Sequence, residues 1–84
     1  MIFGRDNRKW RVTLEGRDLA ADKPFLQTIW VHVAAEADAT QAAIAALKQA
    51  QAGFTRVVEI GRHKSTFKML PGGTYAEGRI YFEA

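Results

Sequence analysis

The sequence predicts an α+β fold: an antiparallel sheet of four to five strands with one alanine-rich helix packed on one face, in an order close to ββαββ. Three observations predict it. Apolar and polar side chains alternate early in the chain, as they do in half-buried strands. The middle of the chain changes to a helical period, and the rest returns to short strand-like runs separated by turn residues. The 84 residues fit a single domain, residues 1–84.

The strands before the helix are predicted from this alternation. In residues 10–15, WRVTLE, every second side chain is apolar, which is typical of a half-buried strand. Residues 25–35, FLQTIWVHVAA, are rather apolar on both faces, which predicts a central strand. The polar stretch 16–24 between them, which ends at Pro24, is predicted to be a loop. A short strand over residues 1–5 is a further prediction.

The helix is predicted over residues 39–52. Asp38 is placed to cap its first turn, and Gln41 can reach back as in a capping box. Gly53 suits the left-handed position after the last turn. The face toward the sheet is predicted to combine small side chains with two large ones, so that the helix can lie close to the strands. That face consists of Thr40, Ala43, Ile44, Leu47 and Ala50.

After the helix, the pattern predicts a hairpin. Residues 54–61, FTRVVEIG, and residues 66–70, TFKML, are strand-like, and the sequence RHKS between them is predicted to be the turn. Residues 71–78, PGGTYAEG, are predicted as another turn, with Gly72 or Gly73 at positive φ. Residues 79–84 are predicted as a last strand.

The positive charge lies in two segments, and both are candidate binding sites. Residues 5–11 and residues 62–68 each carry a net charge of +3, so the rest of the chain sums to −3 although the total is only +3. Such segments suit phosphate or an acidic protein surface, but lysine and arginine at strand ends can also serve solubility alone. The candidate residues are Arg62, His63, Lys64 and Lys68 in the predicted turn, and Arg5, Arg8, Lys9 and Arg11 near the N-terminus.

The chemistry-bearing residues give no motif of a known enzyme or metal site. There is no cysteine, and His32 and His63 lack the spacing of metal ligands, so no metal, cofactor or catalytic residue is assigned. His32 is predicted to be a hydrogen-bonded histidine at the core. Trp10 and Trp30 are predicted to be core residues, with base stacking on an open sheet face as the alternative. The N-terminus lacks an apolar leader, which favours the cytoplasm and no membrane.

Residues 53–63, GFTRVVEIGRH, resemble HicA-type toxin ribonucleases. Gly53, Phe54, Gly61 and His63 stand at that family's spacing, and PGG follows as the family's hairpin turn does. Arg62 takes the place of the family's serine. The resemblance implies a fold like that of double-stranded-RNA-binding domains, and a ribonuclease in which His63 acts as the catalytic acid or base.

Three other segments resemble small phage and mobile-element anti-CRISPR proteins of the type I-F format. These are WRVTLEGRD, ATQAAIAALKQA and RVVEIGRHKSTFKMLP, which follow the order strand, helix, hairpin. The resemblance implies a protein that binds a component of a host defence complex and blocks it sterically.

The sequence therefore predicts a small non-enzymatic binding protein, most concretely an anti-CRISPR-like inhibitor from a phage or mobile element. Its predicted partner is a protein with an acidic surface. The alternative is a basic nucleic-acid-binding protein, at the extreme a HicA-like ribonuclease. The oligomeric state stays open, with a dimer as one option.

Overall fold

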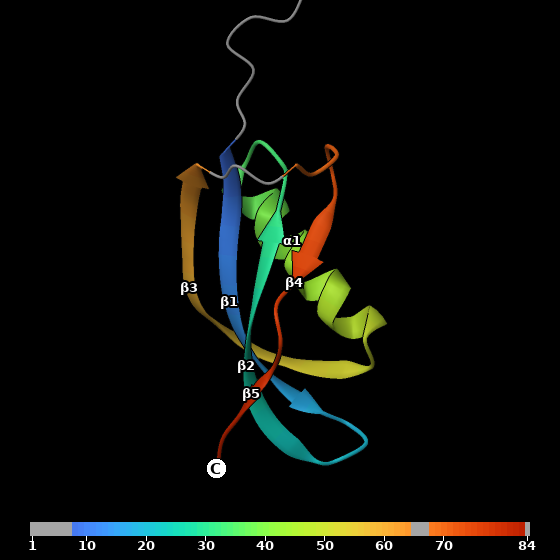
Figure 1. Cartoon of the computed structure of the whole chain (residues 1–84). Coiled ribbons are helices and arrows are strands. Elements are labelled where there is room, and N and C mark those ends of the chain that lie inside the picture. The colour runs from blue at the N-terminus through green and yellow to red at the C-terminus, as the bar shows by residue number, and fades with distance from the viewer. Residues whose placement is uncertain (1–7, 65–67, 84) are drawn as a thin grey trace, which may run out of the picture.

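The computed structural model describes residues 8–64 and 68–83. It shows an open antiparallel sheet of five strands with one helix, in the chain order ββαβββ, which confirms the predicted α+β class (Figure 1). The elements are β1 (Arg8–Asp18), β2 (Lys23–Val31), α1 (Glu36–Gln49), β3 (Ala52–Lys64), β4 (Thr74–Ala76) and β5 (Ile80–Tyr81). The strand predicted over residues 1–5 lies outside the described residues.

The sheet has the strand order β3-β1-β2-β4, and β5 pairs with the first half of β2, whereas β4 pairs with its end. The predicted pairing of residues 54–61 with residues 66–70 is wrong for the described residues: β3 pairs antiparallel with β1, and residues 68–70 form no strand, while residues 66–67 lie outside the described residues. The pairing with β1 sets apolar residues opposite one another, Val12 opposite Ile60 and Leu14 opposite Val57. Shared burial of those side chains favours this partner.

Residues 16–24 do not form the predicted long loop. Both strands continue through most of this stretch, and only residues 19–22 form the turn between β1 and β2. The Asp18 carboxylate accepts hydrogen bonds from the amides of Ala20 and Ala21, each at 3.0 Å, and Asp22 takes a positive φ of 57°. An aspartate that bonds the backbone in this way closes a tight turn without glycine, and the composition alone did not indicate it.

The helix begins and ends three residues earlier than predicted. Ala35, rather than Asp38, occupies the N-cap position and makes no side-chain cap bond, whereas Asp38 lies in the first turn, where its charge suits the helix dipole. Gln51, rather than Gly53, takes the left-handed conformation after the helix, with φ of 61°. The buried helix residues are Ala39, Ala43 and Leu47, so Ala43 and Leu47 confirm the predicted face while Ala50 is exposed.

The core lies between α1 and one face of the sheet, which is called the helix face. Small side chains on the helix allow it to lie close to the strands. Trp10 projects from β1 into this layer and donates a hydrogen bond from its indole N–H to the carbonyl of Val33 at 3.1 Å, so it is the core tryptophan that the sequence predicted. The buried apolar residues are Val12, Leu14, Phe25, Ile29, Val31, Ala39, Ala43, Leu47 and Ala52.

The C-terminal residues add two short strands to β2. β4 lies inside the stretch 71–78 that was predicted as a turn, and β5 is shorter than the strand predicted over residues 79–84. Gly72 takes a positive φ of 80°, as predicted for one glycine of the pair. His32 is half-buried, and its Nδ1 lies 2.8 Å from the carbonyl oxygen of Met69, so it is hydrogen-bonded as predicted. No helix in the described part of the chain is long and apolar enough to cross a membrane.

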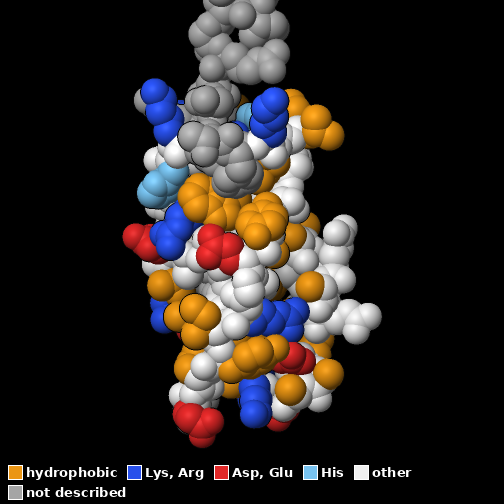
Figure 2. Space-filling model, in the orientation of Figure 1, with side chains coloured by type: hydrophobic (Ala, Val, Ile, Leu, Met, Phe, Trp, Pro, Cys, Tyr) orange, Lys and Arg blue, Asp and Glu red, His pale blue; other side chains and the backbone are white. Residues whose placement is uncertain are grey.

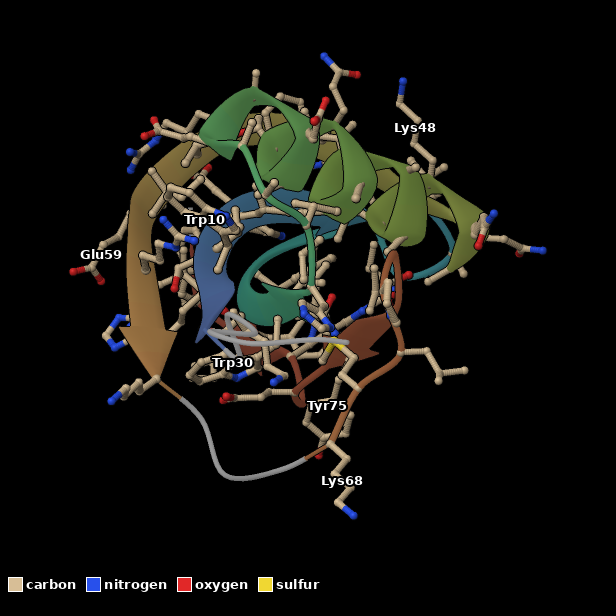
Figure 3. All side chains as sticks on the ribbon, turned by 90° about the horizontal axis from the view of Figure 1, so that it is seen from above. Trp10, Trp30, Lys48, Glu59, Lys68 and Tyr75 are labelled. Atoms are coloured by element: carbon tan, nitrogen blue, oxygen red, sulfur yellow. The ribbon has the colours of Figure 1, made fainter. Side chains whose placement is uncertain are left out.

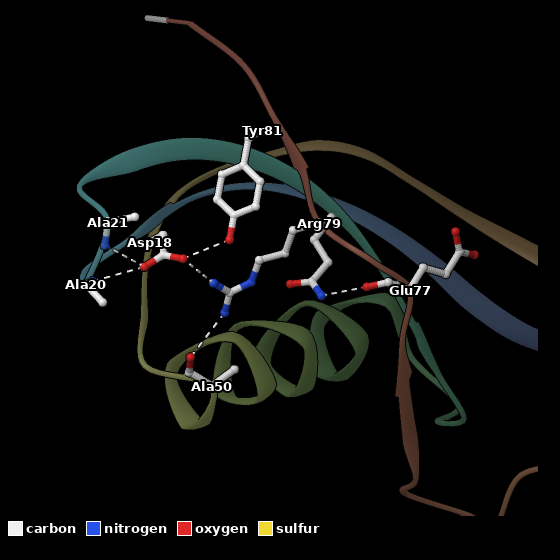
Figure 4. Close-up of polar contacts among 8 residues, drawn as sticks. Asp18, Ala20, Ala21, Ala50, Glu77, Arg79 and Tyr81 are labelled. Carbon is white, nitrogen blue, oxygen red and sulfur yellow. Dashed lines mark hydrogen bonds and ion pairs between the residues drawn. The ribbon is translucent and has the colours of Figure 1, made fainter.

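Asp18 joins the C-terminal segment to the β1–β2 turn, and Arg79 joins it to the end of the helix (Figure 4). One oxygen accepts the two turn amides, and the other accepts hydrogen bonds from Arg79 at 3.1 Å and from the Tyr81 hydroxyl at 2.8 Å. Arg79 also donates to the carbonyl of Ala50 at the helix C-terminus, 3.1 Å away. This set of bonds holds the segment that carries β4 and β5 against the rest of the molecule.

We expect Asp18 to make stability depend on pH in acid. The amide of Ala21 and the Tyr81 hydroxyl, in that order, lower the pKa of the Asp18 carboxyl, because their hydrogen bonds favour its charged form. A lowered folded-state pKa means that the stabilisation is complete above the ordinary value of about 3.9 and is lost as the pH falls through the folded value.

Thermal unfolding of wild type and Asp18→Asn between about pH 6 and pH 2 measures this effect. We expect the variant to have the lower melting temperature at pH 6 and the two melting temperatures to converge at pH 2. Since every other carboxylate is common to both proteins, a constant difference across this range would show that the charge of Asp18 does not stabilise the fold.

Candidate binding face

The fold brings the two basic segments of the sequence together at one end of the sheet. β1 begins where β3 ends, and the register sets Arg8 opposite Lys64 and Lys9 opposite His63. Residues 8–11 of β1 and 62–64 of β3 are called the basic end of the sheet. Arg5 lies outside the described residues. Residues 62–64 are not in the predicted turn, because β3 continues through them.

The side chains of the basic end project to both sides of the sheet, because successive residues of a strand alternate. Arg62 lies on the helix face, where its guanidinium carbon is 5.7 Å from the centre of the Trp10 ring, a cation–π contact. Lys9 is only 3% exposed, so it is a buried residue and not part of an accessible surface. Arg11 is half-buried on the face opposite the helix, called the open face, 3.6 Å from the Glu59 carboxylate.

Two aromatic side chains lie side by side on the open face, on the far side of the sheet from Trp10 (Figure 3). Trp30 of β2 is directly opposite Tyr75 of β4 in the strand pairing. The Trp30 indole N–H donates to the Glu77 carboxylate at 2.7 Å, and the Tyr75 side chain is largely accessible, with 57% of the residue exposed. The two tryptophans therefore lie on opposite faces of the sheet: Trp10 packs against the core, and Trp30 belongs to the open face.

His63 extends this group. Its ring meets the Trp30 ring edge to face, with 5.8 Å between the ring centres. Gly61 makes room for it, since a Cβ at that position would lie 3.2 Å from the His63 Nε2 atom. Trp30, Tyr75 and His63 are called the aromatic patch, and they come from three strands that are distant in the sequence.

Charged side chains surround the aromatic patch on the open face. Figure 2 shows apolar side chains near the middle of this face, with basic and histidine side chains toward its upper end and acidic ones among them. Lys68 is exposed and projects on the same side of the sheet as Trp30 and Tyr75 (Figure 3). Glu59, whose side chain is 70% exposed, and Glu77 contribute the negative charges nearest to the patch.

Sequence analysis identified the basic residues of this surface and His63, but it did not identify Tyr75 or the partner of Trp30, Glu77. Tyr75 and Glu77 lay in a predicted turn, and the alternation in TYAE is too short to indicate a strand. Trp30 was predicted to be a core residue, with base stacking as the alternative, because its face could not be assigned without the position of the helix; the core prediction holds for Trp10 and is wrong for Trp30. Of the predicted residues, Arg11, His63 and Lys68 lie on the side of the open face, whereas Arg62 and Lys64 lie on the helix face.

The surroundings of His63 bear on the ribonuclease alternative. Among the described residues no hydrogen-bonding partner orients its imidazole, and its contact is with the Trp30 ring. Arg62, which takes the place of the HicA serine, projects from the opposite face of the same strand. The pair therefore does not form one site, whereas His63 and Trp30 do lie together.

No protein-family model, curated protein or solved structure matches this chain.

Proposed function

We propose that this protein is a small non-enzymatic binding protein that docks on an acidic surface of a protein partner. The docking surface is the open face, where the aromatic patch anchors the partner and the basic side chains of Arg11 and Lys68 attract it. No catalytic residue, metal or cofactor is part of the proposal.

One observation carries the proposal: Trp30 and Tyr75, side by side on a sheet face that the helix leaves uncovered, beside a cluster of basic residues. Tryptophan, tyrosine and arginine are the residues that contribute most to the affinity of protein interfaces. Basic residues around such anchors raise the rate of association with an acidic partner and set its orientation. The aromatic patch and its surrounding charges have this composition.

The charges on the open face favour a protein over a nucleic acid. Glu59 and Glu77 lie next to the aromatic patch, so a phosphate backbone crossing the patch would meet negative charges. A protein surface can match mixed charges one by one. Single-stranded nucleic acid is nevertheless the second candidate, because adjacent aromatic rings on an open sheet can stack bases.

The more specific form of the proposal is an inhibitor of a host defence complex, encoded by a phage or a mobile element. Its support is the resemblance of the sequence to anti-CRISPR proteins of the type I-F format. A binding face on a small compact domain suits steric blocking, since such an inhibitor needs only to occupy a surface that the complex uses.

Capture from a nuclease-treated host lysate tests the proposed function. The immobilised wild-type protein is expected to retain one stoichiometric protein species. The double variant Trp30→Ala/Tyr75→Ala is expected to retain at least about tenfold less, as is usual when central anchors are removed. Tyr75→Ala alone should show a smaller loss, and its exposed position makes it a safe variant for folding.

Leu19→Ala is the matched control, because Leu19 is an exposed apolar residue in the turn between β1 and β2, at the opposite end of β2 from Trp30. It should capture the partner as wild type does. Recovery that disappears on nuclease treatment, together with a gel shift at about 50 mM salt, would instead establish the nucleic-acid candidate. Equal capture by wild type and the double variant would contradict the docking surface.

A further inference from the structure

β3 forms one edge of the sheet. Within the described residues β1 pairs with its inner side, and no strand pairs with its outer side (Figure 1). An edge strand presents unpaired backbone N–H and C=O groups that can accept another strand. At 13 residues, β3 is also the longest of the described strands.

Two irregularities divide β3 into a part that suits strand pairing and a part that does not. The register between β1 and β3 shifts near Leu14 and again near Gly16, which leaves Thr55 and Val58 without a partner residue in β1. Bulges of this kind twist an edge away from pairing. Residues 59–64, by contrast, pair with β1 one residue after another without a shift, so this segment has the regular geometry that a further strand needs.

The charges of residues 59–64 indicate which kind of strand can pair with this edge. Arg62 and Lys64 lie exposed on the helix face, and His63 lies exposed on the open face, against the single acid Glu59. A second copy of this chain would bring another such cluster against the first, and like charges across paired strands are unfavourable. An acidic strand would be complementary on the helix face.

We infer that residues 59–64 of β3 accept an extended acidic segment of the partner as an added strand. Backbone hydrogen bonds along the edge would supply affinity, and acidic side chains opposite Arg62 and Lys64 would supply specificity. This inference rests on the proposed function, since it specifies how the acidic protein partner is held next to the open face.

Fluorescence anisotropy with a labelled synthetic peptide, in which glutamate and valine alternate, tests strand addition. Two further peptides carry N-methyl groups on all glutamates or on all valines. Since alternate backbone N–H groups of a strand face opposite edges, one methylated peptide should lose at least about tenfold in affinity and the other should bind as the parent does. Arg62→Gln/Lys64→Gln should weaken the parent peptide, whereas Lys23→Gln/Lys48→Gln should not.

Three outcomes would overturn the inference. Equal binding of all three peptides would mean attraction by charge alone, and binding of none would mean that the edge does not accept such a strand. If the protein sediments as a dimer and does not bind the peptides, the edge is occupied by a second copy of the chain. In each case, loss of lysate capture by the Trp30→Ala/Tyr75→Ala variant would still support the docking surface, so the failures of the two proposals are distinguishable.

Discussion

Phe25→Ala is expected to lower the free energy of unfolding by about 3–5 kcal/mol, since truncating a buried phenylalanine both removes apolar burial and leaves a cavity. Phe25 is completely buried beneath α1. Its ring also meets the Tyr81 ring edge to face at 5.7 Å and lies 4.4 Å from the guanidinium of Arg79. The variant therefore weakens both the core and the attachment of the C-terminal segment.

Urea unfolding at 25 °C measures this effect. A domain of this size is typically stable by about 4–13 kcal/mol, so Phe25→Ala is expected to unfold at much lower urea than wild type. Phe82→Ala is the control with the same chemical change, because Phe82 is exposed near the C-terminus. Equal losses for the two variants would contradict the position of the core between helix and sheet.

Gly16→Ala is expected to destabilise the protein although it adds only one methyl group. A Cβ at residue 16 would lie 2.8 Å from the carbonyl oxygen of Gly53, 3.0 Å from the Phe25 ring and 3.1 Å from the Leu47 side chain. The carbonyl belongs to the backbone of β3 and cannot move without disturbing the strand. Overpacking of this kind costs about 1–3 kcal/mol or more.

Gly78→Ala is the matched control, because a Cβ there would meet nothing within 4 Å. The same urea experiment should give a lower midpoint for Gly16→Ala and little change for Gly78→Ala. If Gly16→Ala unfolded at the wild-type midpoint, the close approach of β1, β3 and the helix would be wrong.

The sequence predicted the fold class because its strongest signals are local. The alternation in WRVTLE and the alanine-rich helical period each require only neighbouring residues to be recognised, and both elements are present. Leu47 and Ala43 were likewise identified as buried because the helical period places them on one face.

Errors arose where tertiary contacts override local preference. Asp18 closes the first turn with its own side chain and with Arg79 and Tyr81, which are distant in sequence, so residues 16–24 had the composition of a loop without being one. β3 pairs with β1 rather than with the following residues because the register buries Val12 and Leu14. No local pattern distinguishes these two pairings.

The candidate site was predictable in charge but not in geometry. The sequence indicated two basic segments, and the antiparallel pairing of β1 with β3 joins them at one end of the sheet. Which side chains face solvent depends on which face the helix covers. For this reason Trp10 and Trp30, similar in sequence context, differ in the structure, and Tyr75 was missed altogether.

The central claim is that the open face and its basic surroundings, rather than net charge, hold an acidic protein partner. The most direct measurement compares two variants that each lose two positive charges. Arg11→Gln/Lys68→Gln alters basic residues on the side of the open face, and Lys23→Gln/Lys48→Gln alters the start of β2 and the outer side of the helix (Figure 3).

In capture from nuclease-treated lysate, the first variant is expected to retain at least about tenfold less partner than wild type, and the second to retain as much as wild type. Equal retention by both variants would contradict the account.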